Sequence, residues 1–257
     1  MSISMSYKYY APNDNNFCAL KEEYFWCSKR KFLNDPFDTH GEIINRFPKF
    51  KDELRKIGMQ VDSYPTIYDD FGICCFSKGI LNKHLWAFYA ESFKGWALEF
   101  KDEEIDNVGQ FNGYPINYKD VLYLTEWPNL DKLDSLLRID RSRVSIGVMI
   151  KDGQKIDRLF EYLLLIKEKS IWKTEAEKRI ILGRVYAEDH QEKDIAGYKL
   201  NWPSGILKSI IAGHNIGIKN LEKIKKIARF KNVPLYKTKT VDSGLGFEIT
   251  TEEIVLN

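Results

Sequence analysis

The order of the predicted secondary-structure elements is the feature that most constrains the fold. Apolar segments typical of strands recur along the chain, for example at Phe71–Ser77 and Trp96–Phe100. Helical segments separate only some of them, so the regular strand–helix–strand alternation of a parallel sheet is missing. We therefore predict an α+β fold in which helices flank a mixed, largely antiparallel sheet.

Capping residues and apolar spacing place the remaining elements. Asn82 can cap a helix at Lys83–Phe93, and Gly95 ends it because glycine disfavours a helix interior. The other predicted strands span 6–10, 24–27, 116–124, 178–186, 233–238 and 246–250. The other predicted helices span 17–21, 41–57, 130–148, 154–169, 204–212 and 220–230.

The chain of 257 residues is long enough for one large domain or two small ones. It contains no internal repeat, low-complexity block or Pro/Gly-rich linker, and its turn residues are spread evenly. We therefore predict a single domain over 1–257, with a helical insertion at about 130–170 and a basic helical region at about 203–232.

Neither a membrane span nor a secretion signal is predicted. No apolar run approaches the roughly 20 residues needed to cross a bilayer, and Met1–Ser6 lacks a basic segment followed by an apolar one. The cysteines, Cys18, Cys27, Cys74 and Cys75, form neither a Cys-x-x-Cys motif nor the spaced Cys and His pairs of a zinc site. We expect a cytoplasmic protein with reduced thiols, no membrane contact and no bound metal.

The segment Trp172–Arg179 leads into the apolar run Ile180–Leu182 and carries the clearest cluster of charges. Side chains two residues apart in an extended strand share a face, so Glu175, Glu177 and Arg179 are expected to point the same way. One carboxylate can then pair with Arg179, which leaves the other to accept a hydrogen bond from a substrate. The alternative is a solvated strand edge whose charges meet only water and one another.

Ser77 ends an apolar strand, where a polar side chain can emerge from the core into a cleft. We predict a ligand contact there, and the alternative is a turn or cap residue. Trp86 and Tyr89 lie three residues apart on the next helix and share a face, which can form either a ring platform for a ligand or part of the core. The chain has no Gly-x-Ser-x-Gly, Walker, Gly-x-Gly-x-x-Gly or His-Glu-x-x-His motif, so the enzymes that use them are not indicated.

Several short motifs follow one another in a definite order. They are Tyr7-Lys8-Tyr9, Asn34-Asp35-Pro36-Phe37-Asp38, Cys75-Phe76-Ser77, Leu85-Trp86-Ala87-Phe88-Tyr89-Ala90, Lys94-Gly95, Glu99-Phe100, Trp172-x-x-Glu175-x-Glu177-x-Arg179 and Ile210-Ile211-Ala212-Gly213. With this set the chain resembles the bacterial family labelled domain of unknown function 2971, from about Tyr7 to Tyr236. That family has no settled activity, so the resemblance by itself implies no function.

Three of the motifs are also similar, in their order, to those of ADP-ribosyltransferases. These are a strand with a polar residue (Tyr7-Lys8-Tyr9), a strand with Ser77, and a later strand with the Glu-x-Glu of the arginine-specific branch (Glu175-Ala176-Glu177). The resemblance implies an ADP-ribosyltransferase-like fold with NAD as substrate, in a transferase or an NAD glycohydrolase. The first motif departs from the pattern, because neither His nor Arg stands there.

The same resemblance implies a role for each residue. Glu177 would stabilise the oxocarbenium character that develops when the nicotinamide–ribose bond breaks. Glu175 would orient or deprotonate an acceptor, and Ser77 would steady the glutamate or the ribose. Either Tyr9 or Trp86 would stack on the nicotinamide ring. The residues expected to contact NAD are Tyr7, Lys8, Tyr9, Asn34, Asp35, Trp86, Tyr89 and Arg179.

A different interpretation starts from the uneven charge. The chain has a net charge of only +2, yet Pro203–Lys239 contains nine Lys or Arg residues against one acid, Glu222. The region from Lys208 to Lys239 could bind nucleic acid, with Phe230 and Tyr236 as stacking side chains. A solvated helix face is the alternative for this stretch.

Two further alternatives remain open. A metal-dependent nuclease would need a lysine two residues after its glutamate, whereas Arg179 stands two residues after Glu177. The chain could also be a regulatory or interaction protein without chemistry. We expect a bacterial protein of this kind to act in phage defence or a toxin system, although no residue of the sequence indicates it.

Overall fold

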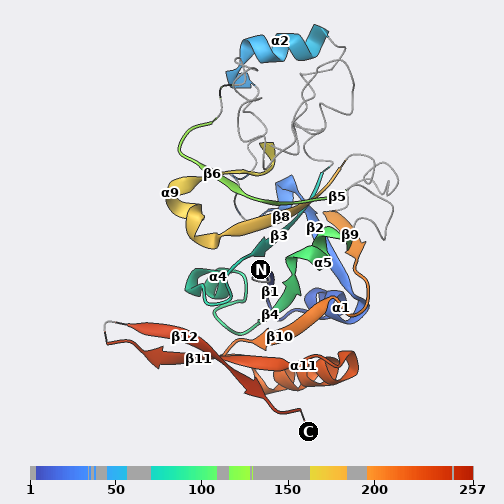
Figure 1. Ribbon diagram of the computed structural model, residues 1–257, viewed down its shortest axis with the longest axis vertical. Coiled ribbons are helices and arrows are strands. Elements are labelled where there is room, and N and C mark those ends of the chain that lie inside the picture. Colours follow the sequence, from blue (N-terminus) through green and yellow to red (C-terminus); the bar gives the residue numbers. More distant parts are fainter. Residues whose placement is uncertain are drawn as a thin grey trace.

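A sheet of ten strands organises the computed structural model, which describes residues 4–33, 35, 38, 45–56, 71–108, 116–127, 129, 163–183, 196–244 and 246–256 (Figure 1). The strands of this sheet are β1 (Met5–Tyr10), β2 (Tyr24–Lys29), β3 (Gly72–Ser77), β4 (Trp96–Lys101), β5 (Ile116–Asp120), β8 (Glu177–Leu182), β9 (Gly197–Asn201), β10 (Leu207–Ala212), β11 (Leu235–Asp242) and β12 (Phe247–Ile254). Their order is β12-β11-β10-β4-β1-β3-β2-β9, and β8 and β5 branch from β3. A second, two-stranded sheet pairs β6 (Leu122–Leu124) with β7 (Ile166–Glu168).

The predicted fold class is confirmed. In the described part of the chain, strand neighbours run antiparallel except for the parallel pairs β10–β11 and β6–β7. The first of these pairs is connected through the long helix α11 (Ile218–Lys231), as parallel neighbours require. Together with the antiparallel neighbours, the pair β10–β11 makes the large sheet a mixed, mostly antiparallel one, as in an α+β protein.

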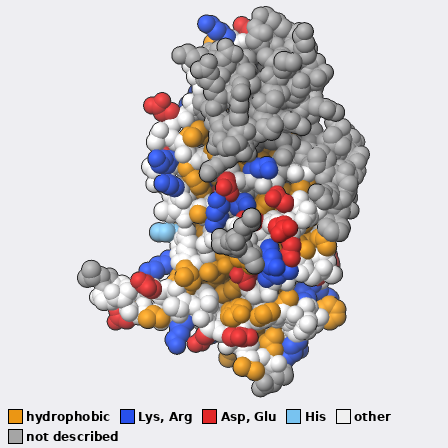
Figure 2. Space-filling view, viewed as in Figure 1, with side chains coloured by type: hydrophobic (Ala, Val, Ile, Leu, Met, Phe, Trp, Pro, Cys, Tyr) orange, Lys and Arg blue, Asp and Glu red, His pale blue; other side chains and the backbone are white. Residues whose placement is uncertain are grey.

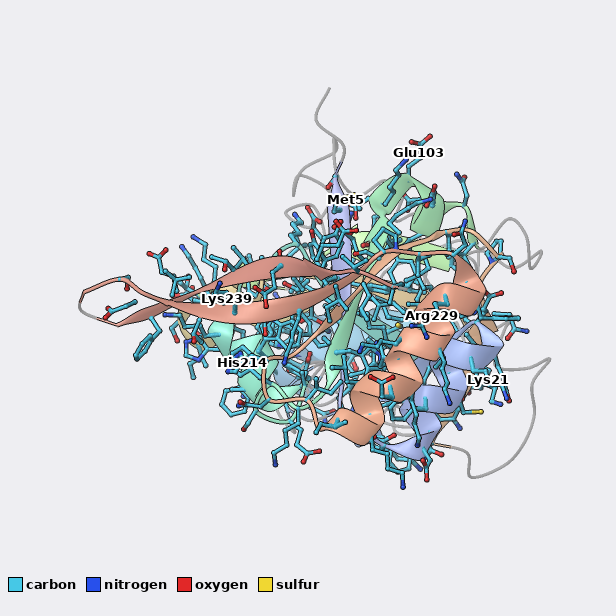
Figure 3. The ribbon with its side chains drawn as sticks, turned by 90° about the horizontal axis from the view of Figure 1, so that it is seen from below. Met5, Lys21, Glu103, His214, Arg229 and Lys239 are labelled. Atoms are coloured by element: carbon cyan, nitrogen blue, oxygen red, sulfur yellow. The ribbon has the colours of Figure 1, made fainter. Side chains whose placement is uncertain are left out.

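Helices flank the sheet at several places. Helix α1 (Asp14–Glu22) lies beside α11 (Figure 3), and Lys223 of α11 approaches Asp14 at 3.8 Å. Asn13 caps α1 by accepting a hydrogen bond from the Asn16 amide, as its short polar side chain favours. The other helical segments are η1 (Arg30–Phe32), α2 (Pro48–Lys56), α4 (Lys83–Phe88), α5 (Asp102–Asp106), α9 (Lys169–Trp172) and η4 (Lys173–Glu175).

Strand β3 is where the sheet splits. On one side β8 pairs with it along its whole length, from Gly72 to Ser77. On the other side β2 pairs with its first two residues and β1 pairs only with its last, Ser77. The strands β1 and β2 therefore part beside the middle of β3, and Lys8 of β1 donates from Nζ to the Cys75 carbonyl there, at 3.2 Å.

Side-chain alternation separates the two faces of β3 and β8. Cys74, Phe76, Ile180 and Leu182 point into the main core, where Phe76 packs edge-on against Phe25. The residues between them point to the opposite face, as the two-residue period of a strand requires. That opposite face carries the polar side chains of the site.

Some sequence-based boundaries are wrong. The predicted helix 204–212 contains strand β10, whose β-branched Ile210 and Ile211 pair with both β4 and β11. Its apolar residues also fit a helical spacing, and tertiary pairing overrides that pattern. The end of the predicted helix 154–169 is likewise strand β7 at Ile166–Glu168, and most of the predicted insertion at 130–170 lies outside the described residues.

Gly95 is one of the described glycines at which the fold leaves no room for a side chain. A Cβ atom added there would overlap the carbonyl oxygen of Tyr10 on the neighbouring strand. We expect Gly95→Ala to lower the free energy of unfolding by about 1–3 kcal/mol or more, because backbone atoms must move to accommodate it. Urea unfolding of Gly95→Ala and of Gly79→Ala, where a Cβ would meet nothing within 4 Å, checks this. Equal stability of the two variants would contradict the close approach.

Candidate functional site

Three of the predicted site residues form a row across three adjacent strands. Tyr7 of β1 lies opposite Ser77 of β3, and Ser77 lies opposite Glu177 of β8. The three motifs, far apart in sequence, therefore meet at the end of β3 next to the split in the sheet. The row depends only on strand pairing, so it follows directly from the topology.

Glu177 and Arg179 share a face of β8, as predicted from the strand period. Their side chains are nearly or fully buried, at 5% and 0% exposure. Arg179 donates from Nε to Glu177 Oε1 at 2.7 Å and from Nη2 to Oε2 at 3.1 Å. A planar guanidinium matches a carboxylate in this two-pronged geometry, so the pair is fixed in orientation as well as in charge.

Glu175 lies close to Glu177 although it does not belong to strand β8. The expectation of an extended backbone at Glu175 is wrong, because this residue ends η4 and Ala176 turns the backbone through a left-handed conformation with φ of 45°. Ser77 holds this turn: its Oγ donates to the Glu175 carbonyl at 2.7 Å and accepts from the Gly79 amide at 3.2 Å. The Glu175 carboxylate is thereby placed beside that of Glu177.

Lys167 of β7 joins the two glutamates. Its Nζ lies 2.7 Å from Glu175 Oε2, 3.2 Å from Glu177 Oε2 and 3.6 Å from Asp38 Oδ2. Asp38 Oδ2 also accepts a hydrogen bond from Arg179, whose Nη1 donates to the Leu164 carbonyl at 2.6 Å. We call Asp38, Lys167, Glu175, Glu177 and Arg179 the charged cluster.

The charged cluster has one more carboxylate than it has cations when all five groups are charged. Burial on its own would raise the pKa of Glu177, but the charges of Arg179 and Lys167 outweigh burial and hold that pKa at about 2. Burial raises the pKa of Glu175 above its usual value, and the charge of Lys167 opposes this only in part. The cluster thus offers one carboxylate that is held ionised beside one whose pKa is raised above its usual value.

A cavity of about 190 Å³ opens in front of the cluster, at the split between β1 and β2. Polar and charged groups share its wall with aromatic rings. We call it the central cavity, and the residues in its wall that the following argument uses are Tyr7, Tyr9, Ser77, Tyr89, Glu175 and Glu177. Aromatic walls with a few convergent polar groups are typical of small-molecule sites.

No protein-family model, curated protein or solved structure matches the chain. The resemblances stated from the sequence therefore stay predictions, and the site has to be interpreted from its own geometry.

The structure places most of the predicted NAD contacts in the wall of the central cavity. Tyr89 donates from its hydroxyl to Glu175 Oε1 at 3.1 Å, and Tyr9 donates to the Gly79 carbonyl at 2.7 Å. Tyr7 donates to Glu99 Oε1 at 2.9 Å, so its ring rather than its hydroxyl is free to meet a ligand. Lys8 and Asp35 also line the cavity, whereas Asn34 lies outside the described residues.

Trp86 requires a correction, because it lies behind the cavity rather than in its wall. Its ring is 0% exposed, stacks on Phe93 and packs nearly perpendicular to the ring of Tyr9. Its Nε1 donates to the Ile80 carbonyl at 2.7 Å, which satisfies the polar end of the indole. Trp86 thus supports Tyr9 from the core, and stacking of Trp86 on a ligand is not supported.

Sequence reasoning missed Asp38 and Lys167 as members of the site. Asp38 is the last residue of the loop motif Asn34–Asp38. A loop pattern does not indicate which side chain its carboxylate contacts. Lys167 falls in a segment predicted as helix, and its pairing with Glu175 depends on the short β6–β7 sheet. In the described part of the chain, no group of three or more His, Cys, Asp or Glu side chains is arranged to hold a metal ion.

The basic region lies at the other end of the sheet from β8 (Figure 1). Several cations of α11 have acidic neighbours: Lys225 lies 2.8 Å from Glu222, and Lys231 lies 2.8 Å from Glu23. On the face drawn in Figure 2, acidic and basic side chains are interspersed among the described residues. None of the helices described is long and apolar enough to span a membrane.

Proposed function

We propose that this chain cleaves the bond between nicotinamide and ribose in NAD, as an ADP-ribosyltransferase-like enzyme or an NAD glycohydrolase. The observation that carries the proposal is the row of Tyr7, Ser77 and Glu177 across β1, β3 and β8. These residues come from the three motifs that resemble those of ADP-ribosyltransferases, and they stand next to one another at the wall of one cavity.

The charge of the site supports a substrate that is cationic at its reacting end. The nicotinamide ring of NAD carries a positive charge, and the charged cluster has one carboxylate in excess. The rings of Tyr7, Tyr9 and Tyr89 line the same cavity and provide faces for a flat cation. At about 190 Å³ the cavity is smaller than the roughly 300–1,000 Å³ of typical ligand sites, so it would hold the nicotinamide end of NAD rather than the entire molecule.

The proposed reaction breaks one bond to ribose C1 and forms another. The bond from ribose C1 to the nicotinamide nitrogen breaks, and both electrons leave with nicotinamide, which becomes neutral. Positive charge then develops on C1 and the ring oxygen of the ribose, where a fixed carboxylate stabilises it. An oxygen or nitrogen nucleophile, from water or another acceptor, forms the new bond to C1 and gives up a proton.

The two glutamates suit different steps of this reaction. Glu177 stays ionised because its pKa is held at about 2, so it provides a constant negative charge beside the developing cation. Glu175 has a raised pKa and lies at the cavity wall, so it is the better group to accept the proton of the nucleophile. Ser77 fixes the backbone of Glu175 and thereby the distance between the two carboxylates.

The direct test is NAD turnover by the purified full chain, with release of nicotinamide followed by chromatography. Turnover at enzyme concentrations far below that of NAD would support the proposal. Turnover that ADP-ribosylates no added acceptor would indicate the glycohydrolase, in which water is the nucleophile. A folded protein that releases no nicotinamide, with or without candidate acceptors, would contradict the proposal and favour a binding function.

The pH dependence distinguishes the role of Glu175. A group that accepts a proton acts only when ionised, so turnover is expected to fall as pH is lowered through the raised pKa of Glu175. Glu175→Gln should lower turnover by about 10²–10⁴-fold, the usual contribution of such a group, and should remove this acidic limb. Rate profiles between pH 4 and 9 on both proteins provide the measurement. An unchanged acidic limb in Glu175→Gln would assign the titration to another group.

A further inference from the structure

Lysine side chains gather where β3 and β5 end and β8 begins. An open cavity of about 560 Å³ lies there, and its wall includes Lys78, Lys119, Lys173 and Lys178. A neighbouring cavity of about 570 Å³ shares Lys173 and adds Lys169. Helix α9, which carries Lys169, lies beside β6 at this edge of the molecule (Figure 1). We call the two cavities together, with these lysines in their walls, the lysine groove.

Three lysines of the groove have no acidic partner in the described part of the chain. Lys119, Lys169 and Lys173 are exposed, and none of them makes an ion pair with a described carboxylate. Like charges held along one wall repel one another, and salt weakens this repulsion only by screening it. A polyanion bound along the groove would remove the repulsion.

The two acids in the walls of the groove do not balance these charges. Asp120 Oδ2 lies 2.8 Å from Lys78 Nζ, so this carboxylate is already paired. The Glu177 carboxylate accepts hydrogen bonds from Arg179 and Lys167 of the charged cluster. The groove therefore presents an excess of positive charge, which opposes a cationic ligand and favours an anionic one.

The groove suits a chain of anionic groups rather than a single one. Because Lys173 belongs to both cavities, the positive charge continues from one cavity to the other. The second cavity is also lined by Thr125, Ser170 and Thr174, whose hydroxyls are of the kind that bond to phosphate oxygens. The half-buried ring of Tyr123 belongs to the first wall, where a base can stack on it. Repeated phosphates with flat bases between them are the chemistry of a nucleic acid strand.

We propose that the lysine groove binds single-stranded nucleic acid through the phosphates of its backbone. Lysine is a flexible point charge rather than a planar fork, so it suits phosphate contacts that do not depend on sequence. A single strand leaves its bases free to meet Tyr123, whereas a duplex keeps them stacked on one another. This interface is separate from the basic C-terminal region, where Lys225 and Lys231 already pair with acids.

Binding is measured on the full chain by fluorescence anisotropy, in the absence of NAD, with labelled oligothymidylate and oligouridylate of about 12 nucleotides. Unlabelled tripolyphosphate, oligoglutamate and duplex DNA serve as competitors beside the unlabelled single strand. The test variant combines Lys119→Gln with Lys173→Gln, which removes two lysines without breaking an ion pair to a described residue. The matched control combines Lys219→Gln with Lys226→Gln, which removes the same charge from exposed positions on α11.

We expect at least one of the two strands to bind, and the test variant to weaken its binding by about tenfold at low salt. Each lost phosphate contact to a single strand lowers the slope of log affinity against log salt concentration by about 0.7, so the slope should become shallower by about 1.4. The control variant should keep the wild-type affinity and slope. Both variants change exposed side chains, and circular dichroism spectra check that they are folded.

Four results would overturn the proposal. The first two are failure of both strands to bind wild-type protein and wild-type affinity in the test variant. The third is an equal loss in the control variant, which would show that only net charge matters. The fourth is competition by tripolyphosphate, oligoglutamate or duplex DNA that equals or exceeds that of the single strand, which would assign the groove to another polyanion. Because the readout is binding without NAD, its result is independent of whether NAD is cleaved.

Discussion

Replacing Glu177 with glutamine is expected to reduce NAD turnover by about 10²–10³-fold, the usual loss when one electrostatic contact to a transition state is removed. Glutamine has the size of glutamate, so the row of Tyr7, Ser77 and residue 177 keeps its shape while the permanent negative charge is lost. The pKa of about 2 means that wild-type Glu177 is ionised throughout the physiological range. Nicotinamide release by variant and wild type, at saturating NAD, provides the measurement.

Stability must be separated from chemistry in this variant. Glu177 is the two-pronged partner of Arg179, and breaking a buried ion pair costs about 3–5 kcal/mol. Asp102→Asn offers a matched control, because Asp102 pairs with Lys178 at 2.8 Å on the opposite face of the same sheet. We expect Asp102→Asn to lower the thermal midpoint while turnover by the folded protein persists. Wild-type turnover in Glu177→Gln, or an equal loss in Asp102→Asn, would contradict the assigned role.

Strand faces were the part of the site that could be predicted from sequence. The two-residue period is enough to place Glu177 and Arg179 on one face, and the end of an apolar strand is enough to single out Ser77. Both conclusions use only neighbours along the chain. The row that joins Ser77 to Tyr7 needs strand pairing as well, which the motif order indicated only through a resemblance.

The remaining parts of the site depend on contacts that no local pattern encodes. Lys167 of the small second sheet pairs with Glu177, and Asp38 pairs with Arg179, from which it is 141 residues away in sequence. Glu175 was placed correctly near Glu177 but for the wrong reason, because a left-handed Ala176 and not an extended strand brings it there. The error at 204–212 has a similar origin, since Ile210 and Ile211 fit a helix until β4 and β11 pair with them.

Replacing Arg179 with methionine is expected to have the largest effect on stability. Arg179 is fully buried and donates to Glu177, Asp38 and the Leu164 carbonyl. Methionine fills similar volume but leaves two buried carboxylates without this partner, so unfolding should become easier by about 3–5 kcal/mol. Urea unfolding of Arg179→Met and of Arg179→Lys measures this. Lysine keeps the charge without the planar fork, so its loss should be smaller but still present.

The double variant Glu177→Gln with Arg179→Met shows what the pair contributes. It removes one charge of each sign, so the buried excess of one carboxylate is unchanged, and its loss of stability should be smaller than the sum of the two single losses by about 1 kcal/mol or more. Additive losses would contradict a direct interaction. Buried ion pairs are often replaceable by uncharged groups at little net loss of stability. A double variant that is nearly as stable as wild type, yet releases no nicotinamide, would therefore show that the chain keeps these charges for chemistry rather than for folding.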